Sequence, residues 1–225
     1  MICLTRTIRR VIRRVIPIAC GTVLVLGGIH GSAQGAAEQS AHDVVLASSE
    51  ALMAVVADGR AYYDADPERY FVAVHDVLSP VVDFERIAKS VMGREHFRSA
   101  SPEQLQRFVE VFRWGLVRAY AGALIGFGQD RMEVVPDRRP PEYPNRRYVN
   151  MRIQADGGKV YAVMYTMIKA TDGYWRMANL TVEGVDLGMG YRSQFQRAME
   201  ELRDMDRVID TWTQRITNDE IEIGE

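Results

Sequence analysis

The chain has 225 residues, of which 26% are charged, and its 28 Lys and Arg against 30 Asp and Glu give a formal net charge of −2. This near balance argues against nonspecific binding to nucleic acid or to an anionic membrane surface. The only cysteines, Cys3 and Cys20, lie near the start, which excludes a disulfide framework or a cysteine metal site in the rest of the chain.

Residues 1–35 have the pattern of a secretory signal peptide. A basic stretch over 1–14 is followed by an apolar run over 15–29 and then by small residues, so cleavage after Ala33 or Gly35 fits equally well. An uncleaved membrane anchor is the alternative, although the run is shorter than the ~20 residues that span a bilayer. Both the general and the twin-arginine export routes stay open. Cleavage removes five arginines, which leaves 23 basic against 30 acidic residues and a net charge of −7.

The first half of the remaining chain reads as helical. Apolar periodicity predicts helix over 41–78 with a break at 65–67, and then a short amphipathic helix over 81–93 that Gly93 closes. The clearest helix start is a capping box, in which Ser101 is the N-cap and Gln104 the third helical residue. One apolar stripe follows at helical spacing: Leu105, Phe108, Val109, Phe112, Leu116, Tyr120 and Leu124.

The second half changes to strands after a polar, Pro-rich loop over 136–147. Strands are predicted at 131–135, 148–155, 160–169 and 174–182, with tight turns "DGG" at 156–158 and "TDG" at 171–173. Helix returns from Gly190, and the tail 217–225 is expected to be disordered. The predicted fold class is α+β: several helices packed on a twisted antiparallel sheet of about four strands, in a single domain over 36–216.

Two-residue turns would fix which side chains share a face of the sheet. Face one then carries Val149, Met151, Ile153, Ala162, Met164, Ile168, Trp175 and Met177. Face two carries polar residues of the first strand together with Tyr161, Val163, Tyr165, Met167, Ala178, Leu180 and Val182. Face one is therefore apolar across three strands. A helix-packed core explains this, but its methionines and its mixture of small and large side chains also suit a hollow.

Reactive constellations are few in the sequence. The three histidines after the leader, His42, His75 and His96, have no metal-ligand spacing, and no serine lies in a nucleophile elbow. Asp83 and Glu85 fit a solvated helix end. Arg138, Arg139, Arg146 and Arg147 of the Pro-rich loop suit a phosphate or an acidic partner protein, or else form a solvated charged loop. We expect no catalytic group, metal or cofactor, and a chain that holds a ligand.

Two stretches carry a family resemblance. The segment "WRMANLTVEGVDLGMGYRSQF" at 175–195, and "DFERIAKSVMG" leading into "SPEQLQRFVEVFRWGLVRAYAGAL", resemble the MlaC, or toluene-tolerance auxiliary, family of periplasmic phospholipid-binding proteins. The resemblance covers roughly residues 77–202. Asp186 replaces the family's usual serine, and the last two helices lack the glycines common between them.

The resemblance implies helices and a sheet enclosing an apolar cavity, with the cone of the nuclear transport factors as the nearest analogy. It implies a periplasmic carrier that moves glycerophospholipid between an outer-membrane lipoprotein and porin complex and an inner-membrane ABC transporter with an MCE-domain ring, maintaining outer-membrane lipid asymmetry. At ~0.8 kcal/mol per buried methylene, two acyl chains would contribute about 20 kcal/mol before ordering costs. The expected lipid-binding residues are Leu116, Tyr120, Leu124, Val149, Met151, Ile153, Ala162, Met164, Ile168, Trp175, Met177, Val185, Leu187 and Phe195.

Two other functions stay open. An exported protein-binding accessory subunit would present an exposed apolar patch and no enclosed volume. A cone-shaped enzyme would use Tyr161, Tyr165, His75 or Asp83 as acid-base groups in an apolar pocket, where their pKa values would be perturbed.

Overall fold

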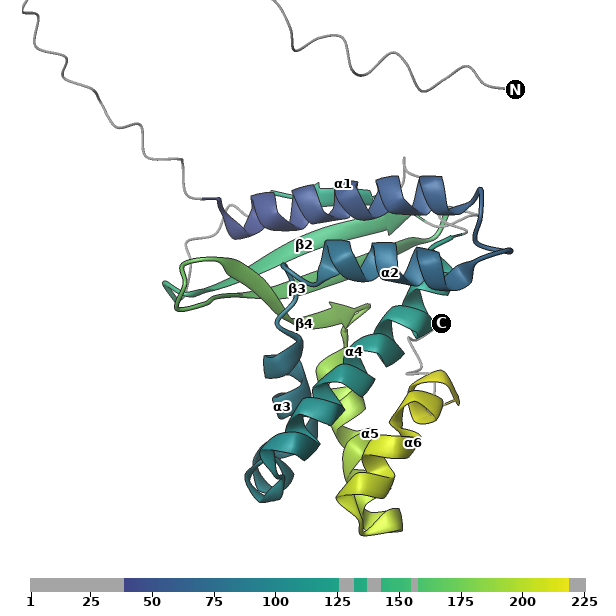
Figure 1. The fold of residues 1–225 in the computed structure, drawn as a ribbon. Coiled ribbons are helices and arrows are strands. Elements are labelled where there is room, and N and C mark those ends of the chain that lie inside the picture. Colours follow the sequence, from purple (N-terminus) through teal and green to yellow (C-terminus); the bar gives the residue numbers. More distant parts are fainter. Residues whose placement is uncertain (1–38, 126–131, 137–142, 155–157, 219–225) are drawn as a thin grey trace, which may run out of the picture. The chain divides into compact units, whose positions relative to one another are not determined.

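The computed structural model describes residues 39–125, 132–136, 143–154 and 158–218, which form six helices and a five-stranded antiparallel sheet (Figure 1). The predicted α+β fold class is confirmed, with one strand more than expected. The predicted signal peptide lies outside the described residues, as does the tail beyond Asn218, where the last helix ends. Within the described ranges, none of the helices is long and apolar enough to cross a membrane.

The first four helices begin where the sequence supplies caps. They are α1 (Ala41–Gly59), α2 (Pro67–Leu78), α3 (Phe84–Ser99) and α4 (Pro102–Leu124). The capping box of α4 is present as predicted, with the Ser101 hydroxyl accepting from the Gln104 amide at 3.1 Å. Gly93 interrupts α3 with a φ of 73°, a conformation that glycine adopts at no steric cost, so the predicted break is confirmed although helix resumes after it.

The sheet runs in chain order from β1 (Met132–Val135) through β2 (Arg146–Gln154), β3 (Val160–Lys169) and β4 (Trp175–Val182) to β5 (Val185–Asp186). The short β5 pairs only with Thr181 and Val182 of β4, and the α2–α3 connection pairs with the same edge at Met177. There the Met177 amide donates to the Val81 carbonyl at 2.8 Å, and the Asp83 amide donates to the Met177 carbonyl at 2.9 Å. This pairing holds α2 and α3 against the sheet.

The predicted distribution of residues between the two faces is wrong for β3. Val149 pairs with Tyr165, Met151 with Val163 and Ile153 with Tyr161, so these residues share one face. Five residues separate the last paired positions, Gln154 and Val160, whereas the prediction assumed a turn of two. A change from an even to an odd number of connecting residues moves every side chain of the strand to the other face. Ala162, Met164 and Ile168 consequently lie on the face away from Val149.

A β-bulge shifts the register of β4 by one residue, which returns Trp175 and Met177 to the face that carries Val149. Beyond the register shift at Thr166 and Met167, Met167 pairs with Met177 and Lys169 with Trp175, while Tyr165 pairs with Leu180. One residue of β4, Ala178, is therefore unpaired, and the strand regains a common face on either side of it. Trp175 and Met177, which were predicted for face one, therefore share a face with Leu180 and Val182, which were predicted for face two. The face of the sheet that packs toward α1 carries Val149, Val163 and Trp175, and we call it the covered face. It combines residues of both predicted faces.

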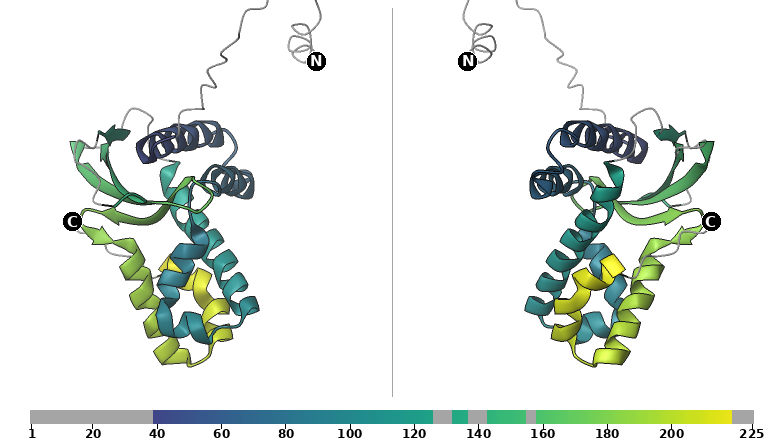
Figure 2. Two further views of the ribbon diagram at one scale, coloured as in Figure 1. Left: turned by 90° about the vertical axis from the view of Figure 1, so that its left-hand side faces the viewer. Right: turned by 90° about the vertical axis from the view of Figure 1, so that its right-hand side faces the viewer.

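Two further helices complete the fold: α5 (Leu187–Leu202), which starts three residues before the predicted Gly190, and α6 (Met205–Asn218). They pack with α3 and α4 below the sheet, whereas α1 and α2 lie along one side of it (Figure 2). The helical group has its own aromatic core of Phe108, Phe112, Phe195 and Trp212, all fully buried. A separate cluster joins α1, α2 and α4, where the Tyr70 hydroxyl donates to the Ala121 carbonyl at 3.0 Å.

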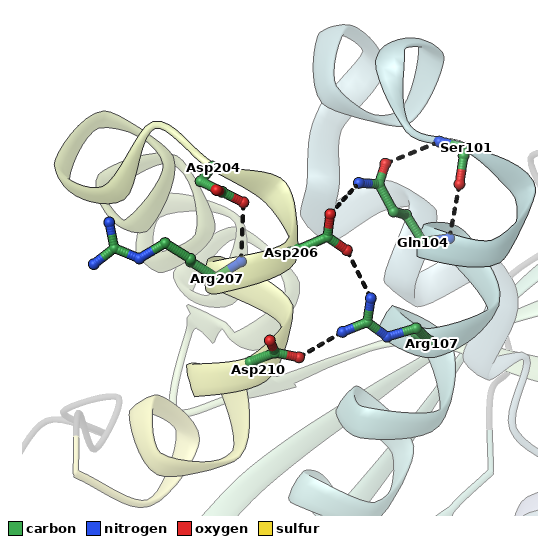
Figure 3. Close-up of polar contacts among 7 residues, drawn as sticks. All are labelled: Ser101, Gln104, Arg107, Asp204, Asp206, Arg207 and Asp210. Atoms are coloured by element: carbon green, nitrogen blue, oxygen red, sulfur yellow. Dashed lines mark hydrogen bonds and ion pairs between the residues drawn. The ribbon is translucent and has the colours of Figure 1, made fainter.

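A polar cluster connects the starts of α4 and α6 (Figure 3). The Arg107 guanidinium donates to Asp206 at 2.6 Å and also to Asp210, and the side chain of Gln104, part of the capping box, donates to Asp206 at 3.0 Å. Arg107 is half-exposed, so solvent and salt screen these pairs. The cluster adds polar contacts to the apolar packing of α6 against α4.

Replacing Arg107 by alanine is expected to lower the free energy of unfolding by about 1 kcal/mol, the upper range for exposed ion pairs, because one guanidinium serves two carboxylates. Most of that loss should disappear at high ionic strength, where the wild-type pairs are screened. Denaturant unfolding at low and at 1 M salt measures both. Arg207→Ala is the matched control, since the Arg207 guanidinium points away from the cluster (Figure 3); an equal, salt-independent loss in both variants would contradict the prediction.

Candidate functional site: an apolar pocket

A pocket of about 540 Å³ lies between the covered face of the sheet and helices α1 to α5; we call it the main pocket. This volume is within the range of ligand sites. Its walls are mostly aliphatic and aromatic. The sheet contributes Met132, Ile153, Tyr161, Val163, Tyr165, Met167, Met177, Asn179, Leu180 and Val182, and the long helix α4 contributes Phe112, Leu116, Val117, Tyr120, Ala121 and Leu124.

The part of the main pocket's lining that the structure describes carries no formal charge. Its lining contains neither a carboxylate nor a histidine, lysine or arginine among the described residues. Its ionisable groups are tyrosines. Burial raises the pKa of Tyr165 to about 12. Burial also raises the pKa of Tyr191, and the neighbouring Tyr120 adds a smaller effect in the same direction. These hydroxyls stay protonated at physiological pH. The pocket therefore favours an uncharged, apolar occupant.

Two hydroxyl groups of the lining meet between α4 and α5. The hydroxyls of Tyr120 and Tyr191 hydrogen-bond to each other, and Tyr120 is 38% exposed, so this part of the lining reaches the surface. Nearby, the Asn179 amide donates to Asp186 at 2.8 Å and its carbonyl accepts from the Gly188 amide at 3.1 Å. A side chain at Gly188 would lie 2.6 Å from the Asn179 oxygen, which explains the glycine. These contacts fix the start of α5 against the sheet.

The predicted lipid-binding residues lie in the lining of the main pocket, in the cluster between α1 and the sheet, or away from the pocket. Leu116, Tyr120, Leu124, Ile153, Met177 and Leu187 line the main pocket. Val149 and Met151 lie on the correct face but are buried beneath the lining, within the cluster between α1 and the sheet. Trp175 belongs to the same cluster and lies outside the lining. Whether the six lining residues bind lipid stays a prediction.

Five predicted residues are placed elsewhere. Ala162, Met164 and Ile168 lie on the other face of β3 because of the five-residue connection. Phe195 is fully buried in the helical core, where its ring lies 5.0 Å from that of Phe108. Val185 is half-buried in β5 and does not line the pocket. The prediction that these five face the cavity is wrong.

The sequence reasoning missed the contribution of the first two helices. Val44, Val45, Ser48, Ser49 and Leu52 of α1 line the main pocket, together with Val74 and Leu78 of α2. Their apolar spacing had indicated a helix with one buried face. The spacing contains no information on whether that face meets side chains or a cavity, so this part of the wall could not be assigned.

Of the four acid-base candidates, Tyr161 and Tyr165 line the main pocket, whereas His75 and Asp83 do not. His75 stacks on Trp114 with ring centroids 4.6 Å apart, and Asp83 caps α3 by accepting from the Arg86 amide at 3.0 Å; neither lines the pocket. Arg138 and Arg139 lie outside the described residues. Arg147, at the start of β2, donates to the backbone carbonyl of Arg146 at 2.7 Å. No cluster of three or more metal-ligating side chains occurs within the ranges described.

Comparisons with known proteins agree with one another. The family model described as MlaC protein matches residues 47–214. The toluene tolerance protein ttg2D of Pseudomonas putida is 34% identical over 177 residues, which cover 78% of this chain and 81% of that protein. The intermembrane phospholipid transport system binding protein MlaC of Haemophilus influenzae is 23% identical over 155 residues, 67% of this chain and 71% of that protein.

A solved structure has the same fold. It is that of a phospholipid-binding protein from Ralstonia solanacearum in complex with a phospholipid. It superposes with a TM-score of 0.68 and 23% sequence identity, covering 80% of this chain and 98% of the other.

Proposed function

Because the chain belongs to the MlaC protein family, we propose that it binds a glycerophospholipid and carries it with its acyl chains in the main pocket. The observation that supports this most directly is the lining itself, which is apolar, uncharged and of ligand size. Burial of each methylene contributes ~0.8 kcal/mol, so hydrocarbon alone supplies ample affinity. The lipid is cargo and no cofactor is required.

The wider proposal concerns transport. We propose that residues 1–35 are an export signal removed in the periplasm, and that the mature protein moves phospholipid between an inner-membrane MCE-domain ABC transporter and an outer-membrane lipoprotein and porin complex. The Haemophilus influenzae relative, named as the binding protein of an intermembrane phospholipid transport system, supports this. A carrier that crosses an aqueous space must shield acyl chains from water, which a deep apolar pocket does.

Lipid extraction tests the binding proposal directly. Protein purified from its native compartment is extracted with organic solvent and the extract is analysed by mass spectrometry. We expect phospholipid at close to one molecule per protein, because the buried hydrocarbon makes dissociation slow. An empty extract from folded protein that also fails to take up added phospholipid would refute the proposal. Comparing the mass of the mature chain with that expected for cleavage after Ala33 or Gly35 tests the export signal in the same sample.

A further inference from the structure

Tyr165 brings a hydroxyl group into the apolar lining of the main pocket. This hydroxyl donates to the Met151 sulfur at 3.6 Å. A thioether sulfur is a weak acceptor, so the bond replaces little of the hydrogen bonding that the hydroxyl would have in water. Burial raises the pKa of Tyr165 to about 12, so the proton stays on the oxygen at physiological pH. Tyr165 therefore carries a poorly satisfied donor beside the space that the cargo fills.

Other polar side chains of the lining have stronger partners. The Ser48 hydroxyl donates to a backbone carbonyl of its own helix at 3.1 Å. The Asn179 side chain donates to a carboxylate and accepts from a backbone amide, and the hydroxyls of Tyr120 and Tyr191 bond to each other. Tyr165 differs from these four residues because its acceptor is sulfur. Its hydroxyl gains a stronger bond whenever the cargo brings an oxygen atom within reach.

The position of Tyr165 in the sheet brings it against the cargo. It lies on β3, the central strand of the five, and pairs with Val149 of β2 and with Leu180 of β4. Leu180 lines the main pocket from the neighbouring strand, and Val163 and Met167 line it from the positions on β3 that flank Tyr165 on the same face. Cargo that lies against the covered face therefore contacts Tyr165 as well.

The chemistry of the lining restricts what the acceptor is. The described lining residues include no cation, so a phosphate or a free carboxylate next to Tyr165 would be buried without a counter-charge. A neutral oxygen carries no such penalty. In a glycerophospholipid, the neutral acceptors nearest to the hydrocarbon are the ester carbonyls that join the acyl chains to glycerol. A carbonyl oxygen has two lone pairs and is a better acceptor than the Met151 sulfur.

We propose that the Tyr165 hydroxyl donates a hydrogen bond to an ester carbonyl of the bound lipid, and that this contact makes the protein select ester-linked over ether-linked phospholipid. This inference rests on the proposed function and adds to it the linkage chemistry of the cargo. The Met151 sulfur is the partner of the hydroxyl in the lipid-free protein, and the ester carbonyl replaces it on binding. An ether linkage lacks the carbonyl oxygen, so an ether lipid leaves the hydroxyl on sulfur.

Competition between two lipids tests the inference. Delipidated protein is offered equal amounts of dipalmitoyl phosphatidylethanolamine and its dihexadecyl ether analogue, which have the same head group and chain length, and native mass spectrometry measures the bound ratio. Tyr165→Phe removes the hydroxyl and keeps the ring. Tyr161→Phe is the matched control, because Tyr161 also lines the pocket from β3, with its ring centroid 4.9 Å from the ammonium of the exposed Lys159. Circular dichroism and a thermal melt check that both variants are folded.

We expect the ester-to-ether ratio to fall about three- to tenfold in Tyr165→Phe, the range for one neutral hydrogen bond, and to keep its wild-type value in Tyr161→Phe. With isotope-labelled ester carbonyls, the carbonyl stretching band of the bound lipid should lie at lower frequency in the wild type than in Tyr165→Phe. An unchanged ratio in Tyr165→Phe, an equal fall in both variants or coincident bands would overturn the inference. Failure of the wild-type protein to bind either lipid would instead refute the proposed function.

Discussion

Replacing Leu180 by glutamate is expected to abolish most phospholipid binding, with occupancy falling by more than about tenfold, while the protein remains folded. Leu180 is half-buried and lines the main pocket from β4. An ionised carboxylate there would be desolvated by acyl chains and would find no cation among the described lining residues, whereas in the lipid-free protein water can enter and hydrate it. The penalty therefore falls mainly on the lipid-bound state.

Met164→Glu is the matched control for this variant. Met164 lies on the neighbouring strand β3, but its side chain is on the face away from the pocket, because Met151 pairs with Val163. We expect its lipid occupancy to equal that of the wild type, measured by extraction and mass spectrometry alongside a thermal melt. Equal occupancy in both variants would show that the covered face of the sheet does not hold the lipid. Loss in Met164→Glu alone would place the lipid on the opposite face.

The helices were predictable because their signals are local. The capping box at Ser101 and Gln104, the proline at 102 and the apolar stripe that follows fix where α4 starts and which side it buries. The break at Gly93 likewise follows from one residue that adopts a positive φ. Such signals depend on neighbours within one helical turn, so they can be read from the sequence without knowledge of the fold.

The faces of the sheet were not predictable, because they depend on counting across connections and bulges. "DGG" at 156–158 suggested a two-residue turn, but the paired strands end at Gln154 and Val160. Because β3 has apolar residues on both faces, its sequence did not reveal that the assumed register was wrong: Val163 and Met164 suit a buried position equally well. The unpaired Ala178 then shifted the register of β4 by one residue, which returned Trp175 and Met177 to the face of Val149. Together the connection and the bulge account for three predicted residues that are absent from the lining, Ala162, Met164 and Ile168, and for six sheet residues that were missed: Tyr161, Val163, Tyr165, Met167, Leu180 and Val182. They do not account for Phe195 and Val185, or for the lining residues of α1 and α2.

The sequence contains little information that distinguishes the pocket from a packed core. A helix that lines a cavity and a helix that packs on a core bury the same kind of apolar stripe, and α1 shows this in Val44, Val45 and Leu52. What distinguishes them is the distance between elements, which is set by contacts elsewhere. In this protein the hydrophobic core of α3, α4, α5 and α6 holds α4 and α5 in place, and Tyr120 of α4 and Tyr191 of α5 line the pocket.

The largest effect on stability is expected at Trp212. It is fully buried on α6, with its ring centroid 5.4 Å from those of both Phe108 and Phe195. Trp212→Ala should lower the free energy of unfolding by about 3–5 kcal/mol, because it removes a large apolar side chain and leaves a cavity that α4 and α5 cannot close. For a domain of this size the melting temperature should fall by roughly 6–20 °C. Denaturant unfolding of delipidated protein measures the change without the stabilisation that bound lipid adds.

Trp212→Phe separates packing from hydrogen bonding at the same position. The indole nitrogen of Trp212 is buried and has no hydrogen-bond partner among the described residues. Phenylalanine loses part of the ring but also removes this unsatisfied donor, which costs about 1–3 kcal/mol when buried. The phenylalanine variant should therefore be clearly more stable than the alanine variant. A loss below about 1 kcal/mol in Trp212→Ala would contradict the prediction, because it would mean that α6 contributes little to the core that positions α4 and α5.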